Sequence, residues 1–284
     1  MVGVEAAFFD LDKTVIARAS MVAFGRPLYR AGLISRWILL RALYGQLVYL
    51  YVGADERRIH RMRDAVLALT KGWDQEHVRR IVRETLIEVV EPIVFDEAVE
   101  LMAEHRQAGR VVYLISASPE EIVIPLAEYL GADDVIATRS KVDEGGRYTG
   151  EVDFYAYGPY KAEAMRAIAD ERGIDLEASY AYSDSATDLP MLEIVGHPGA
   201  VNPDRDLARV ARQHEWEILS FTHKVKLRDR VPLPPAKHTA AVGGGLAAAT
   251  AAVVVWWLLR REPTPAPPRP PFARRATALA RRRR

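Results

Sequence analysis

The stretch Val4–Thr14, VEAAFFDLDKT, decides how the rest of the chain is interpreted. Its apolar run at Val4–Phe9 predicts a buried β-strand, and the acidic residues Asp10 and Asp12 follow where that strand ends. Apolar runs followed by polar side chains recur at Arg110–Ile115 and Ser179–Ser183. We therefore expect several strands that each deliver polar groups from their carboxyl ends.

Helical segments separate these strands, which sets the fold class. We expect helices over Phe95–Ala108, Pro119–Leu130 and Tyr160–Arg172, short strands at Val135–Thr138 and Ala200–Val201, and a Gly-Gly turn within Lys141–Phe154. Strands that alternate with helices predict an α/β fold with a doubly wound parallel sheet. Ligands of such sheets bind beyond the carboxyl ends of the strands.

The polar residues at these ends suggest one site. Asp10, Asp12 and Thr14 follow the first strand, Ser116 follows the second, Asp184 and Asp188 follow a later one, and Lys161 lies near a helix start. Clustered carboxylates repel one another unless a cation neutralises them.

The chemistry of such a cluster follows from its ligand types. The chain has no cysteine, which excludes disulfides, thiolate nucleophiles and Cys-ligated zinc. Oxygen ligands favour Mg²⁺, which usually completes its shell with water and a substrate phosphate. A carboxylate is also able to act as a nucleophile, and a second one two residues on is placed to protonate a leaving oxygen.

Four segments resemble the motifs of the haloacid dehalogenase superfamily. DLDKT at Asp10–Thr14 resembles motif one, LISAS at Leu114–Ser118 motif two, Lys161 suits motif three, and YSDSATD at Tyr182–Asp188 resembles motif four. The resemblance covers about residues 4–220 and is strongest to the phosphoserine phosphatase-like branch, subfamily IB. Lys141 and Arg166 are rivals for the motif-three position.

The resemblance implies a Mg²⁺-dependent phosphomonoester hydrolase and gives each residue a role. Asp10 would be the nucleophile, and Asp12 the general acid and then base. Asp10, Asp184 and the Asp12 main-chain carbonyl would bind the metal. Thr14, Ser116 and Lys161 belong to the phosphate-binding group, and Asp188 would support the site. The alternative is a membrane-anchored binding or regulatory protein that keeps the fold without turnover.

A helical insertion and a C-terminal extension complete the expected organisation. Residues 1–19 and 93–220 would form the catalytic core. Residues 20–92 would form a helical cap, with helices over Ser20–Ala31, Ile34–Val52, Ala54–Leu69 and Asp74–Val90. A basic linker (221–238), a transmembrane helix (239–259) and a Pro/Arg-rich disordered tail (260–284) would follow.

The extension predicts a membrane partner. Residues 239–259 hold no charged side chain over 21 positions, close to the ~20 residues that cross a bilayer. Residues 221–284 carry 14 Lys or Arg against two Asp or Glu, which suits anionic lipids; no specific nucleic-acid partner is expected. Because the N-terminus has no signal-like segment, we expect a single-pass protein of the cell membrane with a cytoplasmic catalytic domain. A helix lying in the membrane interface is the alternative.

Two departures from the phosphoserine-specific pattern concern the substrate. Those enzymes carry a glutamate nine residues after the nucleophile, where this chain has Ala19, and an Asn before the last acid of motif four, where it has Thr187. Phosphoserine is therefore disfavoured. The largely apolar stretch Ile34–Val52 is either a buried cap helix or a surface that contacts a bilayer or an acyl chain. Under the second interpretation a lipid phosphate is an expected substrate, and a small metabolite phosphate is the other.

Overall fold

The computed structural model describes residues 3–35 and 56–224, with side chains from residue 63 onward in the second range. Its centre is a seven-stranded sheet in the order β4-β3-β2-β1-β5-β6-β7. Every neighbouring pair is parallel except β3 and β4. The strands are β1 (Ala6–Asp10), β2 (Val111–Pro119), β3 (Asp134–Val142), β4 (Tyr148–Phe154), β5 (Tyr180–Ser183), β6 (His197–Val201) and β7 (Glu217–Leu219). The predicted α/β class with a parallel sheet is confirmed.

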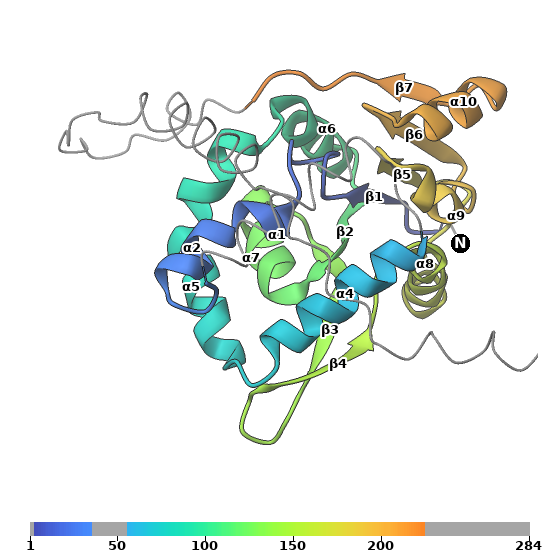
Figure 1. Cartoon of the computed structure of the whole chain (residues 1–284). Coiled ribbons are helices and arrows are strands. Elements are labelled where there is room, and N and C mark those ends of the chain that lie inside the picture. The colour runs from blue at the N-terminus through green and yellow to red at the C-terminus, as the bar shows by residue number, and fades with distance from the viewer. Residues whose placement is uncertain (1–2, 36–55, 225–284) are drawn as a thin grey trace, which may run out of the picture. The chain divides into compact units, whose positions relative to one another are not determined.

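Alternate residues of β1 explain why both faces of the sheet are covered. Ala7 and Phe9 pack into one core cluster, with α6 (Asp96–Gln107) and α7 (Glu120–Leu130). Ala6 and Phe8 pack into the other, with α8 (Pro159–Arg172), α9 (Leu189–Leu192) and α10 (Arg205–Gln213). A strand buried on both faces reads as a continuous apolar run, as this one does. Figure 1 shows β1 and β2 in the middle of this arrangement.

The insertion between β1 and α6 is helical over its described part. It contains α1 (Ser20–Ala23), α2 (Gly25–Arg30), α4 (Glu56–Thr70), α5 (Gln75–Val90) and the 3-10 turn η1 (Glu91–Ile93). The side chain of Asp74 caps α5 by accepting from the His77 amide at 2.7 Å. Most of the predicted helix at Ile34–Val52 lies outside the described residues.

The predicted helix Ser20–Ala31 is wrong as a single element, because it is broken at Phe24 into α1 and α2. Pro27 has no amide hydrogen to donate to the carbonyl of Ala23, so the ladder of a continuous helix is interrupted there. The result is a short first helix that ends close to the sheet.

The two connections into and out of the insertion run side by side. Ala17 donates its amide to Ile93 (2.7 Å), and Phe95 donates to Val15 (3.0 Å). The start of the C-terminal extension joins them, since Asp96 donates its amide to the carbonyl of His223 at 2.9 Å. The insertion is therefore anchored at the carboxyl end of β1.

The C-terminal extension lies almost wholly outside the described residues. Among the residues that the structure describes, no helix is long and apolar enough to cross a membrane. The predicted span at 239–259 and the predicted tail at 260–284 belong to the part that is not described.

Candidate active site

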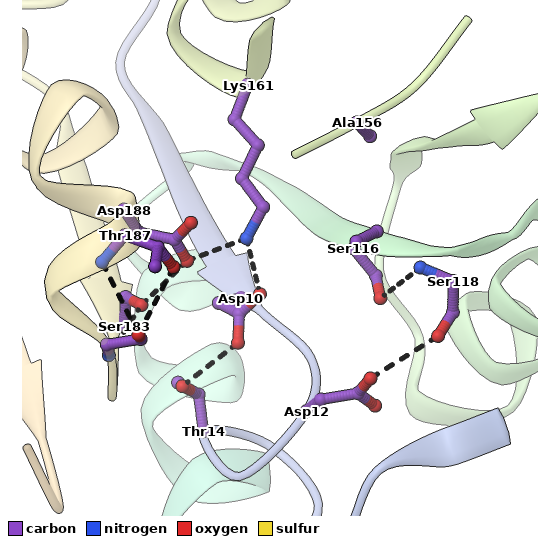
Figure 2. Close-up of polar contacts among 12 residues, drawn as sticks. Asp10, Asp12, Thr14, Ser116, Ser118, Ala156, Lys161, Ser183, Thr187 and Asp188 are labelled. Atoms are coloured by element: carbon purple, nitrogen blue, oxygen red, sulfur yellow. Dashed lines mark hydrogen bonds and ion pairs between the residues drawn. The ribbon is translucent and has the colours of Figure 1, made fainter. Parts of the chain in front are cut away.

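Strand β1 delivers Asp10 to the carboxyl edge of the sheet. Asp10 lies beside Ile115 of β2 in the parallel register, and the Leu11 amide donates to the Ile115 carbonyl at 3.1 Å. The chain then turns sharply at Lys13, whose φ of 66° lies in the left-handed region. Figure 2 shows the side chains of Asp10 and Asp12, which precede this turn, pointing in different directions.

Lys161 joins the first and last acidic residues of the site. Its Nζ lies 2.7 Å from Oδ1 of Asp10 and 2.6 Å from Oδ2 of Asp188, and all three side chains are buried. Burial by itself would lower the pKa of Lys161, but the charges of Asp10 and Asp188 raise it above its ordinary value. Lys161 is therefore held as a cation beside Asp10, and Figure 2 shows it pointing between the two carboxylates.

The rival cations do not occupy this position. Lys141 is exposed on β3 and pairs with Glu151 at 3.3 Å, and Arg166 is exposed on α8. Lys161 lies in the first turn of α8, which begins right after Gly158, a glycine whose φ of 56° lies in the left-handed region.

The loop after β5 places the remaining acids. The Ser183 hydroxyl donates to Oδ2 of Asp188 at 2.8 Å, which fixes that carboxylate against Lys161. Asp184 lies 3.9 Å from the Nζ of Lys13. Burial raises the pKa of Asp184 to about 6; the Lys13 ammonium opposes this rise, and the negative charge of Asp188 adds to it.

Thr14 contacts Asp10, and Ser116 follows the β2 residue that pairs with Asp10. The Thr14 hydroxyl donates to Oδ2 of Asp10 at 3.3 Å. Ser116 follows Ile115 directly, and its hydroxyl oxygen accepts from the Ser118 amide at 3.1 Å. The register of β2 against β3 shifts between Ser116 and Pro119, so the strand is irregular in the segment that carries the Ser116 and Ser118 hydroxyls.

Asp12 is held on the opposite side of the loop. Its Oδ1 accepts from the Ser20 amide at 2.8 Å, and its Oδ2 accepts from the Ser118 hydroxyl at 3.3 Å. Burial raises the pKa of Asp12, and these hydrogen bonds oppose the rise. We did not identify Ser20 or Ser183 as site residues from the sequence. Ser183 directly precedes Asp184, which is a usable signal, whereas Ser20 reads as an ordinary residue at a helix start.

The charge of the cluster fits a divalent cation. Four carboxylates (Asp10, Asp12, Asp184, Asp188) share the site with the ammonium groups of Lys13 and Lys161. Burial raises the pKa of Asp10; Lys161 opposes the rise, and the like charges of Asp188 and Asp184 add to it. An added cation would relieve this repulsion.

The carboxylate side chains do not converge on a single point, however. Among residues 3–35 and 56–224, no three Asp, Glu, His or Cys side chains are gathered so that they could hold a metal ion. The Asp12 carboxylate faces Ser20 and Ser118 instead. The set therefore fits a metal that takes two carboxylates, a main-chain oxygen and solvent, as Mg²⁺ commonly does.

Comparisons with known proteins show which family the chain resembles. The family model described as haloacid dehalogenase-like hydrolase matches residues 7–193. A protein of Mycobacterium tuberculosis named a probable phosphatase is 52% identical over 241 residues, covering 84% of each chain. A phosphoserine phosphatase of the same organism is 34% identical over 242 residues, covering 84% of this chain and 77% of its own.

A solved structure shows the same fold. It is a protein of unknown function from Bordetella pertussis, with a TM-score of 0.66 and 25% identity, covering 77% of this chain and 99% of its own. The residues that the family model matches include Asp10 of β1 and Lys161 of α8. The chain belongs to the haloacid dehalogenase-like hydrolase family.

Proposed function

We propose that this protein is a Mg²⁺-dependent phosphomonoester hydrolase that works through an aspartyl-phosphate on Asp10. The observation that carries the proposal is the position of Lys161, buried between Asp10 and Asp188 at the carboxyl end of β1. A buried cation beside a nucleophilic carboxylate is suited to bind an incoming phosphate dianion.

The residues of the site divide the chemistry between them. An oxygen of Asp10 forms a bond to phosphorus while the bond from phosphorus to the leaving oxygen breaks, and the Asp12 carboxyl gives its proton to that leaving oxygen. The Asp12 carboxylate then takes a proton from water. The water oxygen bonds to phosphorus as the Asp10–phosphorus bond breaks, which releases inorganic phosphate and restores Asp10.

Other side chains bind the transferring phosphoryl group or hold the reacting groups in position. Lys161 and the Ser116 hydroxyl would bind oxygens of the transferring group, and Thr14, which donates to Asp10, keeps the nucleophile oriented. Mg²⁺ bound by Asp10, Asp184 and the Asp12 main-chain carbonyl would supply positive charge to the phosphoryl oxygens. Asp188 holds Lys161 in place.

We propose a lipid phosphate or a small metabolite phosphate as the substrate, rather than phosphoserine. Ala19 stands at the N-cap of α1 and has no group to pair with an amino group. The 34% identical relative is named a phosphoserine phosphatase, so this departure is open to a direct test.

We also propose that the protein attaches to anionic membranes through residues 239–259 and the basic residues around them. The support is the uncharged 21-residue stretch and the arginines after it. Fractionation of the full-length protein tests this. A span resists alkaline carbonate and high salt, an interfacial helix is released by them, and wholly soluble protein at low salt would refute attachment.

Hydrolysis assays test the enzymatic proposal. The full-length protein with Mg²⁺ is screened against p-nitrophenyl phosphate, soluble phosphomonoesters and lipid phosphates in mixed micelles, with Asp10→Asn as the control. Release of inorganic phosphate by the wild type alone supports the proposal. No release from any phosphomonoester would favour the non-catalytic alternative.

A further inference from the structure

A chain of hydrogen bonds ties the first residue of the cap to the side chain of Asp12. The Ser20 and Ser118 hydroxyl oxygens are 2.7 Å apart, and the Ser118 hydroxyl donates to Oδ2 of Asp12 at 3.3 Å. The Ser20 amide donates to the other carboxylate oxygen, Oδ1, at 2.8 Å. Asp12 thus has one donor on each oxygen, one from the cap and one from the core.

The direction of each bond follows from counting protons. A serine hydroxyl has a single hydrogen, and Ser118 gives its hydrogen to the Asp12 carboxylate. The 2.7 Å contact between the two hydroxyls admits either serine as donor, and Ser20 is its donor when Ser118 gives its hydrogen to Asp12. Both serines are buried, with 0% and 4% of their surface exposed, so water does not readily replace either hydroxyl.

The two serines come from different parts of the fold. Ser20 opens α1, the first helix of the insertion, while Ser118 lies at the irregular end of β2. Asp12 itself sits on the loop between β1 and the insertion. The network thus fixes a side chain on a loop by reaching it from two rigid elements.

We propose that Ser118 and Ser20 are positioning residues that hold Asp12 where it protonates the leaving oxygen. The inference rests on the proposed function, because it assigns a task to groups around the proposed acid. A general acid acts only when its proton lies within hydrogen-bond reach of the leaving oxygen. Small displacements of a catalytic group cost large factors in rate.

The dependence of the rate on the leaving group separates this role from a structural one. Nitrophenolate leaves without needing a proton, whereas an alkoxide does need one. The ratio of kcat/KM for an alkyl phosphate to kcat/KM for p-nitrophenyl phosphate therefore measures how much proton donation by the general acid contributes to the rate. Both values exclude the later hydrolysis of the phosphorylated enzyme, which is common to the two substrates.

The experiment uses full-length protein with Mg²⁺, four single serine variants, Asp12→Asn, and the double variant that combines Asp12→Asn with Ser118→Ala. Ser118→Ala is expected to lower the ratio about tenfold, a part of the 10²–10⁴ that general acids contribute. Ser20→Ala keeps the hydrogen bond from the main-chain amide of residue 20 to Asp12, so it is expected to lower the ratio only about two- to threefold. Ser118→Thr retains a hydroxyl and should restore most of the ratio.

Ser179→Ala is the matched control. Ser179 is a fully buried serine that accepts from the Ala6 amide at 3.0 Å, at the opposite end of the sheet from Asp10. It should change stability without changing the ratio. In an Asp12→Asn background, Ser118→Ala should leave the ratio unchanged, because the acid on which it acts is gone.

The outcomes distinguish failure of the proposed function from failure of the positioning role. If the wild type hydrolyses neither substrate, the proposed function fails. If the wild type is active but Ser118→Ala lowers both kcat/KM values by the same factor, or if it still lowers the ratio in the Asp12→Asn background, the positioning role is overturned.

Discussion

The ammonium of Lys161 lies 2.7 Å from Oδ1 of Asp10, although 151 positions of sequence separate the two residues. The same ammonium lies 2.6 Å from Oδ2 of Asp188, so one buried cation serves two buried carboxylates. An incoming phosphate would share this cation with Asp10. The arrangement fixes the Asp10 side chain beside this cation before any substrate arrives.

Replacing the nucleophile is the most direct test of the chemistry. Asp10→Asn keeps the shape of the side chain but cannot form a stable acyl-phosphate, so we expect turnover to fall to the level of a blank. Asp170→Asn, an exposed position on α8, is the control and should retain wild-type activity. Full p-nitrophenyl phosphate hydrolysis by Asp10→Asn would sink the mechanism.

Removing the buried cation should affect both activity and stability. Lys161→Met leaves Asp10 and Asp188 buried without their partner, and breaking such a pair costs about 3–5 kcal/mol. Lys141→Met is the matched control, because Lys141 is an exposed lysine paired with Glu151 and should cost at most about 1 kcal/mol. Urea unfolding measures the loss of stability in each of the two variants. Equal effects would mean that Lys161 is not the buried partner that the structure shows.

Metal binding should be visible without any substrate. Mg²⁺ is expected to raise the thermal midpoint of the wild type, since a ligand that binds only the folded state stabilises it. Asp184→Asn should lose most of that rise, and the exposed Asp170→Asn should keep it. Chelation should stop hydrolysis and Mg²⁺ restore it. A wild type with the same midpoint with and without Mg²⁺ contradicts the site.

His105 predicts that stability falls on the acid side. Burial, with a smaller effect of the Arg110 charge, lowers the pKa of His105 from 6.5 to about 4. Between these values the unfolded chain binds a proton that the folded chain does not. The free energy of unfolding therefore falls as the pH drops through this window, by up to about 3 kcal/mol.

The variant His105→Gln isolates this effect. It should flatten the pH dependence between pH 6.5 and about 4, whatever its cost at neutral pH. His214→Gln, at an exposed position after α10, should leave the pH dependence of the wild type unchanged. Unfolding curves at several pH values supply the measurement. A His105→Gln protein with an undiminished slope would show that another group is responsible.

The identity of residue 19 should influence substrate choice. With Ala19, we expect phosphoserine to be no better than other small phosphomonoesters. Ala19→Glu should raise the selectivity for phosphoserine about ten- to a hundredfold, because a hydrogen bond to a charged group contributes about 1.5–3 kcal/mol. Ala19→Gln has a similar size without the charge and is the control. Competition assays measure the selectivity, and a wild type that prefers phosphoserine refutes the expectation.

The sequence alone was sufficient to predict the central strands and the acidic residues that follow them, but not the edge strand β7. Fully apolar runs such as Val4–Phe9 and Arg110–Ile115 are typical of strands buried on both faces, so the local pattern predicted both the elements and the edge at which they end. The apolar pattern did not reveal the break at Phe24, because that break depends on the amide that Pro27 lacks.

The sequence favoured Lys161, but only the tertiary structure excluded its rivals beside Asp10 and decided what holds Asp12. Lys141, Lys161 and Arg166 are all cations after the second strand, and their spacing does not say which one enters the site. Ser20 and Ser118 meet across 98 positions of sequence, which no local pattern records. Contacts of this kind come from packing the insertion against the sheet, and local periodicity carries no information about partners that distant in the chain.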